Sequence, residues 1–118
     1  MNTRHAAHVQ RMADAVLNGP GETDPALRRD IEAWAAKLGG RPGAEVGEIP
    51  AEVTAYVSKV ALHAYKTCDE DIEALQNLGY SEDAIFEITL SAAIGAGQAR
   101  LERGLAALKG GSDAAQEA

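Results

Sequence analysis

The sequence predicts an all-α protein, and three observations support this fold class. Apolar residues recur at helical spacing, Gly and Pro clusters separate the periodic segments, and no segment shows the alternation of a strand. The 118 residues are the length of one ordinary domain. Hydrophobic residues make up 46% of the chain but aromatics only 4%, and alanine supplies much of the difference. Because alanine buries little area, we expect subunit association to add to the core.

Two helices are expected in the N-terminal part. The first runs from about Thr3 to Leu17, and Gly19-Pro20-Gly21 ends it. The second starts at Asp24, a candidate N-cap, with Pro25 in the first helical position. It closes at Gly39-Gly40, and a loop follows as far as Pro50. Its apolar stripe consists of Leu27, Ile31, Trp34 and Leu38.

A third helix is expected from Pro50 to about Tyr65, and a fourth follows it. The inner face of the third consists of Val53, Tyr56, Val57, Val60 and Ala64. Thr67 and Glu70 have the spacing of a capping box, in which Thr67 caps the fourth helix and Glu70 reaches back. That helix ends at Gly79. Its apolar residues are Ile72, Leu75 and Leu78.

Ser81 is expected to cap a fifth helix that continues to Leu108 and ends at Gly110-Gly111. Inside it, residues 92–97 are nearly all small, although each glycine costs roughly 1 kcal/mol relative to alanine in a helix interior. This segment indicates either tight packing, including packing across a subunit boundary, or a kink. The whole chain then divides into an N-terminal helical segment packed on the core (1–48), the helical core (49–111) and a flexible tail (112–118).

Charge and cysteine content exclude several classes of protein. The net charge is −7, with 18 acidic and 11 basic residues, and no basic stripe is present to neutralise phosphates. We therefore expect neither nucleic-acid binding nor membrane binding. The single cysteine, Cys68, rules out an intrachain disulfide and a cysteine-based zinc cluster, and it favours the cytoplasm. The first ten residues lack the apolar core of a signal peptide.

Cys68 has two interpretations. If Thr67 is the N-cap, Cys68 lies in the first helical turn, where the helix dipole stabilises a thiolate. The carboxylates of Asp69, Glu70 and Asp71 follow immediately and oppose that thiolate. A lone free cysteine is more often a small structural residue. The sequence leaves both a reactive and a structural role open.

The histidines and Glu52 are the other candidates for chemistry. His5 and His8 have the spacing to share a metal, but no third ligand is apparent, so we expect surface histidines, no metal and no cofactor. His63 suits the C-terminus of its helix, and as a histidine it is also a candidate general base. Glu52 lies in the first turn of its helix, where the dipole alone favours a carboxylate.

The segment from Ile49 to Leu108 resembles the carboxymuconolactone decarboxylase and alkylhydroperoxidase D-like family. The pattern is a helix, a short helix, a Gly-aromatic-Ser-Glu turn at Gly79-Tyr80-Ser81-Glu82 and a long helix with Gly95 and Gly97. The resemblance covers about half of the chain, and it implies an alkylhydroperoxidase D-like helical domain with two extra N-terminal helices. It also implies a homo-oligomer, a trimer or a hexamer, with a small organic ligand as a possible partner.

Peroxidase members of that family carry a glutamate, a Cys-x-x-Cys pair and a histidine. Alignment on Gly79-Tyr80-Ser81 places Glu52 on the glutamate, Ala64 and Thr67 on the two cysteines, and Asp71 on the histidine. The dithiol is therefore missing, and Cys68 falls one residue beyond the second cysteine position. The resemblance then implies a divergent binding or assembly protein.

An enzyme is the alternative function. It would use either Cys68 as a single peroxidatic thiol or acid–base chemistry on a small organic acid or lactone. The acid–base residues would be Glu52, His63, Tyr65 and Asp71.

Overall fold

The computed structural model describes the backbone of residues 3–43 and 45–117 and the side-chain environments of residues 4–43 and 45–110. The all-α prediction is confirmed, because these ranges contain five α-helices, one short 3-10 turn and no strand. The elements are α1 (Thr3–Asn18), α2 (Pro25–Leu38), α3 (Ala51–His63), the 3-10 turn η1 (Ala64–Lys66), α4 (Asp69–Asn77) and α5 (Glu82–Glu117).

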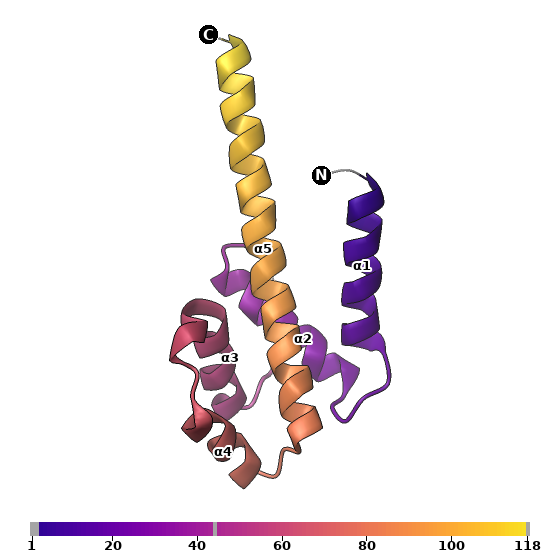
Figure 1. Cartoon of the computed structure of the whole chain (residues 1–118), viewed down its shortest axis with the longest axis vertical. Coiled ribbons are helices and arrows are strands. Elements are labelled where there is room, and N and C mark those ends of the chain that lie inside the picture. The colour runs from indigo at the N-terminus through magenta and orange to yellow at the C-terminus, as the bar shows by residue number, and fades with distance from the viewer. Residues whose placement is uncertain (1–2, 44, 118) are drawn as a thin grey trace.

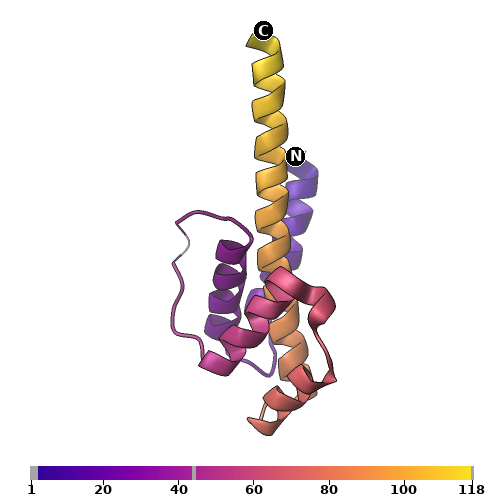
Figure 2. The same ribbon diagram turned by 90° about the vertical axis from the view of Figure 1, so that its left-hand side faces the viewer.

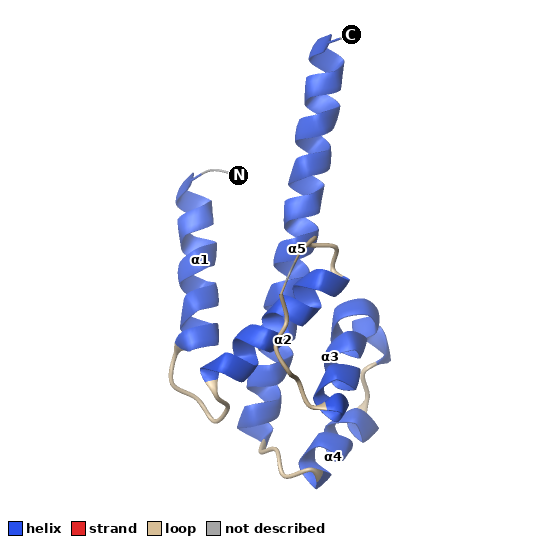
Figure 3. Cartoon of the chain, turned by 180° about the vertical axis from the view of Figure 1, so that it is seen from behind, coloured by secondary structure: helices blue, strands red, loops and turns tan. Residues whose placement is uncertain are grey.

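The long helix α5 is the axis on which the other helices are arranged (Figure 1). Helix α2 crosses it and is its main packing partner, α3 and α4 lie on one side, and α1 stands on the other. The C-terminal part of α5 extends beyond the remaining helices in both side views (Figures 1 and 2), and the molecule is 58 Å along its longest axis. Seen from behind, loops connect the helices and the longest crosses from α2 to α3 (Figure 3). None of the described helices combines the length and apolar character that a membrane crossing requires.

Local sequence signals set most of the helix ends. The Asp24 carboxylate accepts a hydrogen bond from the Ala26 amide at 2.9 Å, as the N-cap prediction requires. The Ser81 hydroxyl accepts one from the Ala84 amide at 3.1 Å. Helix α4 is followed by Gly79, which has a φ of +100°, a conformation that favours glycine.

One apolar core joins α2, α3, α4 and α5. Its buried residues are Ile31, Ala35, Val53, Tyr56, Val57, Ala61, Leu75, Ile85, Ile88, Ala92 and Ala96. The border that we expected at residue 48 therefore crosses a continuous core, because α2 and α3 both bury their apolar faces against α5. Helix α2 is part of the core as well as of the N-terminal segment.

The small-residue segment of α5 is a site of tight packing inside the chain. A Cβ atom on Gly95 would overlap the carbonyl oxygen of Glu32 in α2 and would lie 2.9 Å from its carbonyl carbon. Helix α5 runs through this segment without interruption, so the kink that we considered is absent. The absent side chain at Gly95 is what allows the backbones of α2 and α5 to approach.

Four local predictions are corrected. The N-cap of α4 is Cys68, one residue later than Thr67, because Asp71 rather than Glu70 reaches back to the cap. Ala64 is exposed because α3 tightens into η1 at that residue, and this moves Ala64 off the helical face. Leu78 is 52% exposed because it lies after the last turn of α4.

The end of α5 is the fourth correction. The helix continues through Gly110 and Gly111 to Glu117, so residues 112–117 are helical rather than a tail, and residue 118 lies outside the described residues. Two glycines reduce helix propensity, but they do not end a helix unless the chain also leaves the helical conformation.

Candidate functional site

Helices α3 and α4 form a groove of about 430 Å³ that contains two of the predicted site residues. Glu52 lies in the first turn of α3, and Lys59 follows it seven residues later on the same helical face. Asp71 comes from the first turn of α4. The residues that line the groove are Glu52, Ala55, Tyr56, Lys59, Asp71, Ala74 and Leu75.

A salt bridge between two residues of the groove lining joins the two helices. The Lys59 ammonium donates to both carboxylate oxygens of Asp71, at 3.0 and 2.8 Å. This hydrogen bond is the main reason that the pKa of Asp71 is lowered, and the amide of Cys68 lowers it further. The same hydrogen bond raises the pKa of Lys59. Both groups are therefore charged at neutral pH, and they neutralise each other.

Cys68 contacts the carboxylate of this ion pair. Its amide donates to Asp71 Oδ2 at 2.9 Å, and its sulfur donates to the same oxygen at 3.4 Å. The side chain is exposed. These contacts support the structural interpretation, in which Cys68 is the N-cap residue of α4.

Changing Cys68 to serine is expected to leave the stability unchanged or to raise it by up to about 1 kcal/mol, because serine is among the preferred N-cap residues. Thermal unfolding of the two proteins followed by circular dichroism measures this. Cys68→Val serves as the matched control, since it keeps the size and removes the polar side chain, and it should be less stable than Cys68→Ser. A serine variant less stable than the valine variant would contradict the capping role.

Glu52 is the uncommitted carboxylate of the groove. Its side chain is exposed and makes no hydrogen bond or ion pair with the described residues, whereas the carboxylate of Asp71 is fully engaged. Tyr56 also lines the groove and is 6% exposed, and its hydroxyl is 2.7 Å from the hydroxyl of Thr89 in α5. The groove thus presents one free anionic acceptor beside an apolar wall.

His63 and Tyr65 lie away from the groove lining. Both are exposed, and their rings contact each other edge to face with centroids 6.1 Å apart. Tyr65 is 81% exposed. Of the four residues in the acid–base hypothesis, the groove therefore brings together only Glu52 and Asp71.

The two N-terminal histidines are exposed on α1, and the ring of His8 is 2.6 Å from the guanidinium of Arg11. Within the part of the chain that the structure describes, no group of three His, Cys, Asp or Glu residues is placed to hold a metal ion.

Comparisons with protein-family models, curated proteins and solved structures find no match to this chain. The resemblance to the carboxymuconolactone decarboxylase and alkylhydroperoxidase D-like family therefore stays a prediction.

Sequence reasoning missed Lys59, although its spacing from Glu52 places both on one face of a helix. A lysine on an amphipathic helix usually faces water, so this spacing alone did not distinguish it. The charge of Asp71 on a different helix gives Lys59 its place in the groove.

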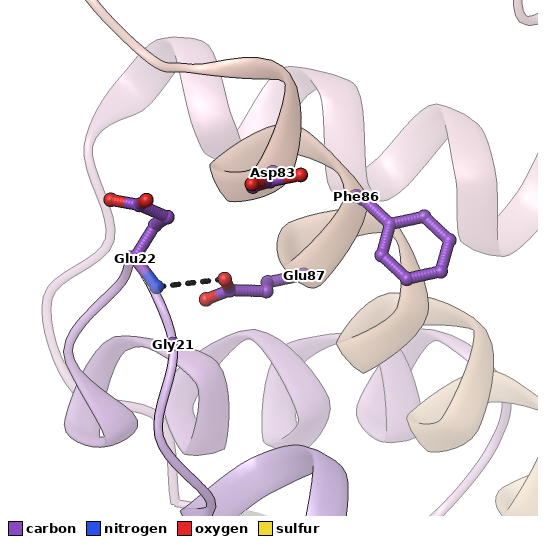
Figure 4. A pocket seen from close by; sticks show the side chains of 5 residues that line it. All are labelled: Gly21, Glu22, Asp83, Phe86 and Glu87. Carbon is purple, nitrogen blue, oxygen red and sulfur yellow. Dashed lines mark hydrogen bonds between the residues drawn. The ribbon is translucent and has the colours of Figure 1, made fainter.

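A second hollow lies between the α1–α2 loop and the start of α5 (Figure 4). It measures about 370 Å³, and Gly21, Glu22, Asp83, Phe86 and Glu87 line it. Figure 4 shows the Glu87 side chain pointing to the loop, where it accepts from the Glu22 amide at 2.8 Å. It also accepts from the amide and the hydroxyl of Thr23, at 2.9 and 2.6 Å.

Burial raises the pKa of Glu87, but the hydrogen bonds from Thr23 and Glu22 and the charge of Arg28 outweigh that effect, so the pKa is lowered. The carboxylate of Glu87 is thus occupied in fastening the loop to α5. We assign this hollow a structural role, and the α3–α4 groove remains the candidate site.

Proposed function

We propose that this chain is a helical homo-oligomer that binds a small organic ligand in the α3–α4 groove and has no dithiol peroxidase activity. The observation that carries the proposal is the pairing of a free carboxylate, Glu52, with an apolar wall in one groove. The family resemblance supports a divergent member that has kept the helices and lost the cysteine pair. The trimer or hexamer and the cytoplasmic location belong to the same proposal.

The charges of the groove define the class of ligand. Asp71 and Lys59 neutralise each other, so Glu52 is the group that remains to bind a ligand. A carboxylate only accepts hydrogen bonds, so the ligand has a donor at that end, a hydroxyl or an ammonium group. Its other end is apolar, because it lies against Ala55, Ala74 and Leu75.

Replacing Glu52 with glutamine is expected to weaken ligand binding about tenfold or more, because a hydrogen bond to a charged group contributes about 1.5–3 kcal/mol. The probes are small amines and alcohols with an apolar tail, and binding is followed through the amide chemical shifts of α3 and α4. Glu48→Gln, in the loop before α3, is the matched control and should bind like the unchanged protein. Shifts that avoid the groove, or equal affinities in all three proteins, would refute the proposal.

Acid–base catalysis at Glu52 is the second candidate function, and the same free carboxylate favours it. Glu52 would act as a general base on a small organic acid or lactone bound in the groove. Glu52→Gln would then abolish turnover, whereas Cys68→Ser would not change it. Substrate binding without turnover in the unchanged protein separates the binding protein from the enzyme.

The alternative in which Cys68 is a peroxidatic thiol predicts a third reaction, reduction of a hydroperoxide at its exposed sulfur. The sulfur would attack the O–O bond, giving a sulfenic acid and an alcohol, and an external thiol would return the two electrons. We expect the rate of hydroperoxide loss to be the same with Cys68→Ser as with the unchanged protein. A rate that falls to background only in the variant would establish the thiol reaction.

A further inference from the structure

One face of α5 is apolar and exposed along most of its length. Three large residues on it, Phe86, Leu101 and Leu108, are 65%, 42% and 70% exposed. At roughly 100° per residue, all members of this face fall within a strip about 80° wide. We call it the α5 stripe, and its exposed residues are Phe86, Ala93, Gly97, Leu101, Gly104 and Leu108.

The α5 stripe points away from the core of its own chain. Gly95, which contacts the backbone of α2, is about half a turn from Gly97 on the helix. A Cβ atom on Gly97 or Gly104 would meet nothing within 4 Å. The C-terminal part of the stripe also lies on the projecting portion of α5, beyond the other helices (Figures 1 and 2). A helical segment without packing partners is marginally stable in water, so a partner on this face would stabilise it.

The order of residues along the stripe is symmetric about Gly97. Phe86 and Leu108 lie eleven residues before and after it, and Ala93 and Leu101 lie four residues before and after it. In an antiparallel pair of α5 helices centred on Gly97, Phe86 of each copy therefore faces Leu108 of the other. Each Leu101 faces an alanine, and the two glycines face each other. Large residues thus meet small ones near the centre, as interdigitated packing requires.

The half-buried Leu90 fits the same scheme. It lies seven residues before Gly97, and Gly104 lies seven residues after it. Leu90 of one copy therefore projects into the space above Gly104 of the other. The resulting spacing of four and three residues is that of the seam between paired helices.

The charges of α5 also favour antiparallel pairing. Acidic residues occupy its start, with Asp83 and Glu87, whereas Arg103 and Lys109 lie toward its end. In the pair centred on Gly97, Lys109 of one copy comes level with the helical turn that carries the exposed Asp83 of the other, on the same side of the seam. A parallel pair would place like charges together, and it would align the two helix dipoles.

Helix α1 provides a side wall for this surface. Met12, which is 51% exposed, forms with Ala93, Ile94, Gly97, Gln98 and Leu101 a hollow of about 270 Å³ beside the centre of the stripe. Helix α1 stands alongside the middle of α5 (Figure 1). Two copies paired through the stripe would therefore place both α1 helices on the same side and enclose this hollow.

We propose that a second copy of this chain docks on the α5 stripe, with the two α5 helices antiparallel and crossing at Gly97. The inference rests on the homo-oligomer of the proposed function, and it names the contact that builds it. The pair is a two-fold unit, so of the proposed trimer and hexamer it fits a hexamer made of dimers and excludes a simple trimer.

The interface is tested by measuring the self-association of the Leu101→Glu variant in sedimentation velocity. We expect association to weaken about tenfold or more, because a charge would be buried against Ala93 of the second copy. Leu62→Glu, on an equally exposed leucine of α3, is the matched control and should assemble like the unchanged protein. An assembly that Leu101→Glu does not weaken would overturn this interface and leave the proposed oligomer standing. A monomeric unchanged protein would overturn both, and ligand binding at Glu52 would still be measured independently.

Cross-linking tests the orientation, with Gly97→Cys and Gly110→Cys each made in the Cys68→Ser protein. Both positions have room for a side chain. Antiparallel pairing brings the two residues 97 together and separates the two residues 110 by roughly 39 Å, so only Gly97→Cys should form a disulfide-linked dimer on mild oxidation. Linkage at both positions would show parallel pairing, and linkage at neither would show a different interface. Either result would refute the proposal.

Discussion

Replacing Gly95 with alanine is expected to lower the free energy of unfolding by about 2 kcal/mol. The new methyl group would overlap the backbone of Glu32, and a backbone cannot rotate away as a side chain can. Helices α2 and α5 would have to separate, and Ile31 and Ala35 would lose contact with α5. This cost exceeds the gain of roughly 1 kcal/mol in helix propensity that alanine brings over glycine.

Chemical denaturation measures the effect, and Gly110→Ala is the matched control. Gly110 lies in the same helix, and a Cβ atom there would meet nothing within 4 Å. The control should therefore be as stable as the unchanged protein or slightly more stable. Equal stability of the two alanine variants would show that α2 and α5 do not approach as closely as described.

Most of the helices could be predicted because local signals are sufficient where they agree. Asp24, Pro25 and the apolar stripe that follows all indicate the same start of α2. At Gly39-Gly40 the stop is real because the amide of Arg41 donates to the Ala36 carbonyl at 2.9 Å and so closes the helix. At Gly110-Gly111 the same dipeptide is not a stop, since the chain stays helical. A glycine pair alone does not distinguish these two cases.

The start of α4 shows what local sequence could not decide. Thr67 and Glu70 form one capping pair, and Cys68 and Asp71 form another with the same spacing. Threonine is the better cap by preference, yet the structure uses Cys68. Lys59, on α3, binds Asp71 and holds its carboxylate where it meets the Cys68 amide. A contact between helices thus selects the register, and no pattern within α4 contains that information.

The candidate site was predicted only in part, because the packing of the helices decides which residues share the groove. The family resemblance singled out Glu52 and Asp71 as candidate residues, and the groove contains both. Tyr65 lies in the 3-10 turn η1, which no local sequence signal predicted, whereas His63 is the last residue of α3. Arg28 was also missed, although it lies three residues before Ile31 on the buried side of α2. An arginine there has to find its acceptors within the protein.

Replacing Arg28 with methionine is expected to lower the free energy of unfolding by about 3 kcal/mol. The guanidinium is 2% exposed and donates to the carbonyls of Val16, Gly19 and Thr23, at 2.6, 2.7 and 3.1 Å. Its Nε atom lies 3.8 Å from the carboxylate of Glu87. Methionine keeps the apolar stem but leaves three carbonyls and a carboxylate without their partner, so the α1–α2 loop would loosen from α5.

The matched control is Arg29→Met on the same helix, because Arg29 is exposed and its side chain hydrogen-bonds only to the side chain of Asn18 among the described residues. It should cost less than about 1 kcal/mol. Equal losses in the two variants would contradict the buried role of Arg28.

The pH dependence of stability tests the contribution of Glu87, the carboxylate that lies beside Arg28. Because the pKa of Glu87 is lowered in the folded protein, its carboxylate stabilises the fold at pH values above the ordinary glutamate range. This contribution is lost as the pH falls through the lowered value. The unchanged protein should therefore exceed Glu87→Gln in stability at neutral pH, and the difference should shrink below roughly pH 4. A difference that stays constant from neutral to acidic pH would mean that the charge of Glu87 does not stabilise the fold and that only its shape and hydrogen bonds to the loop do.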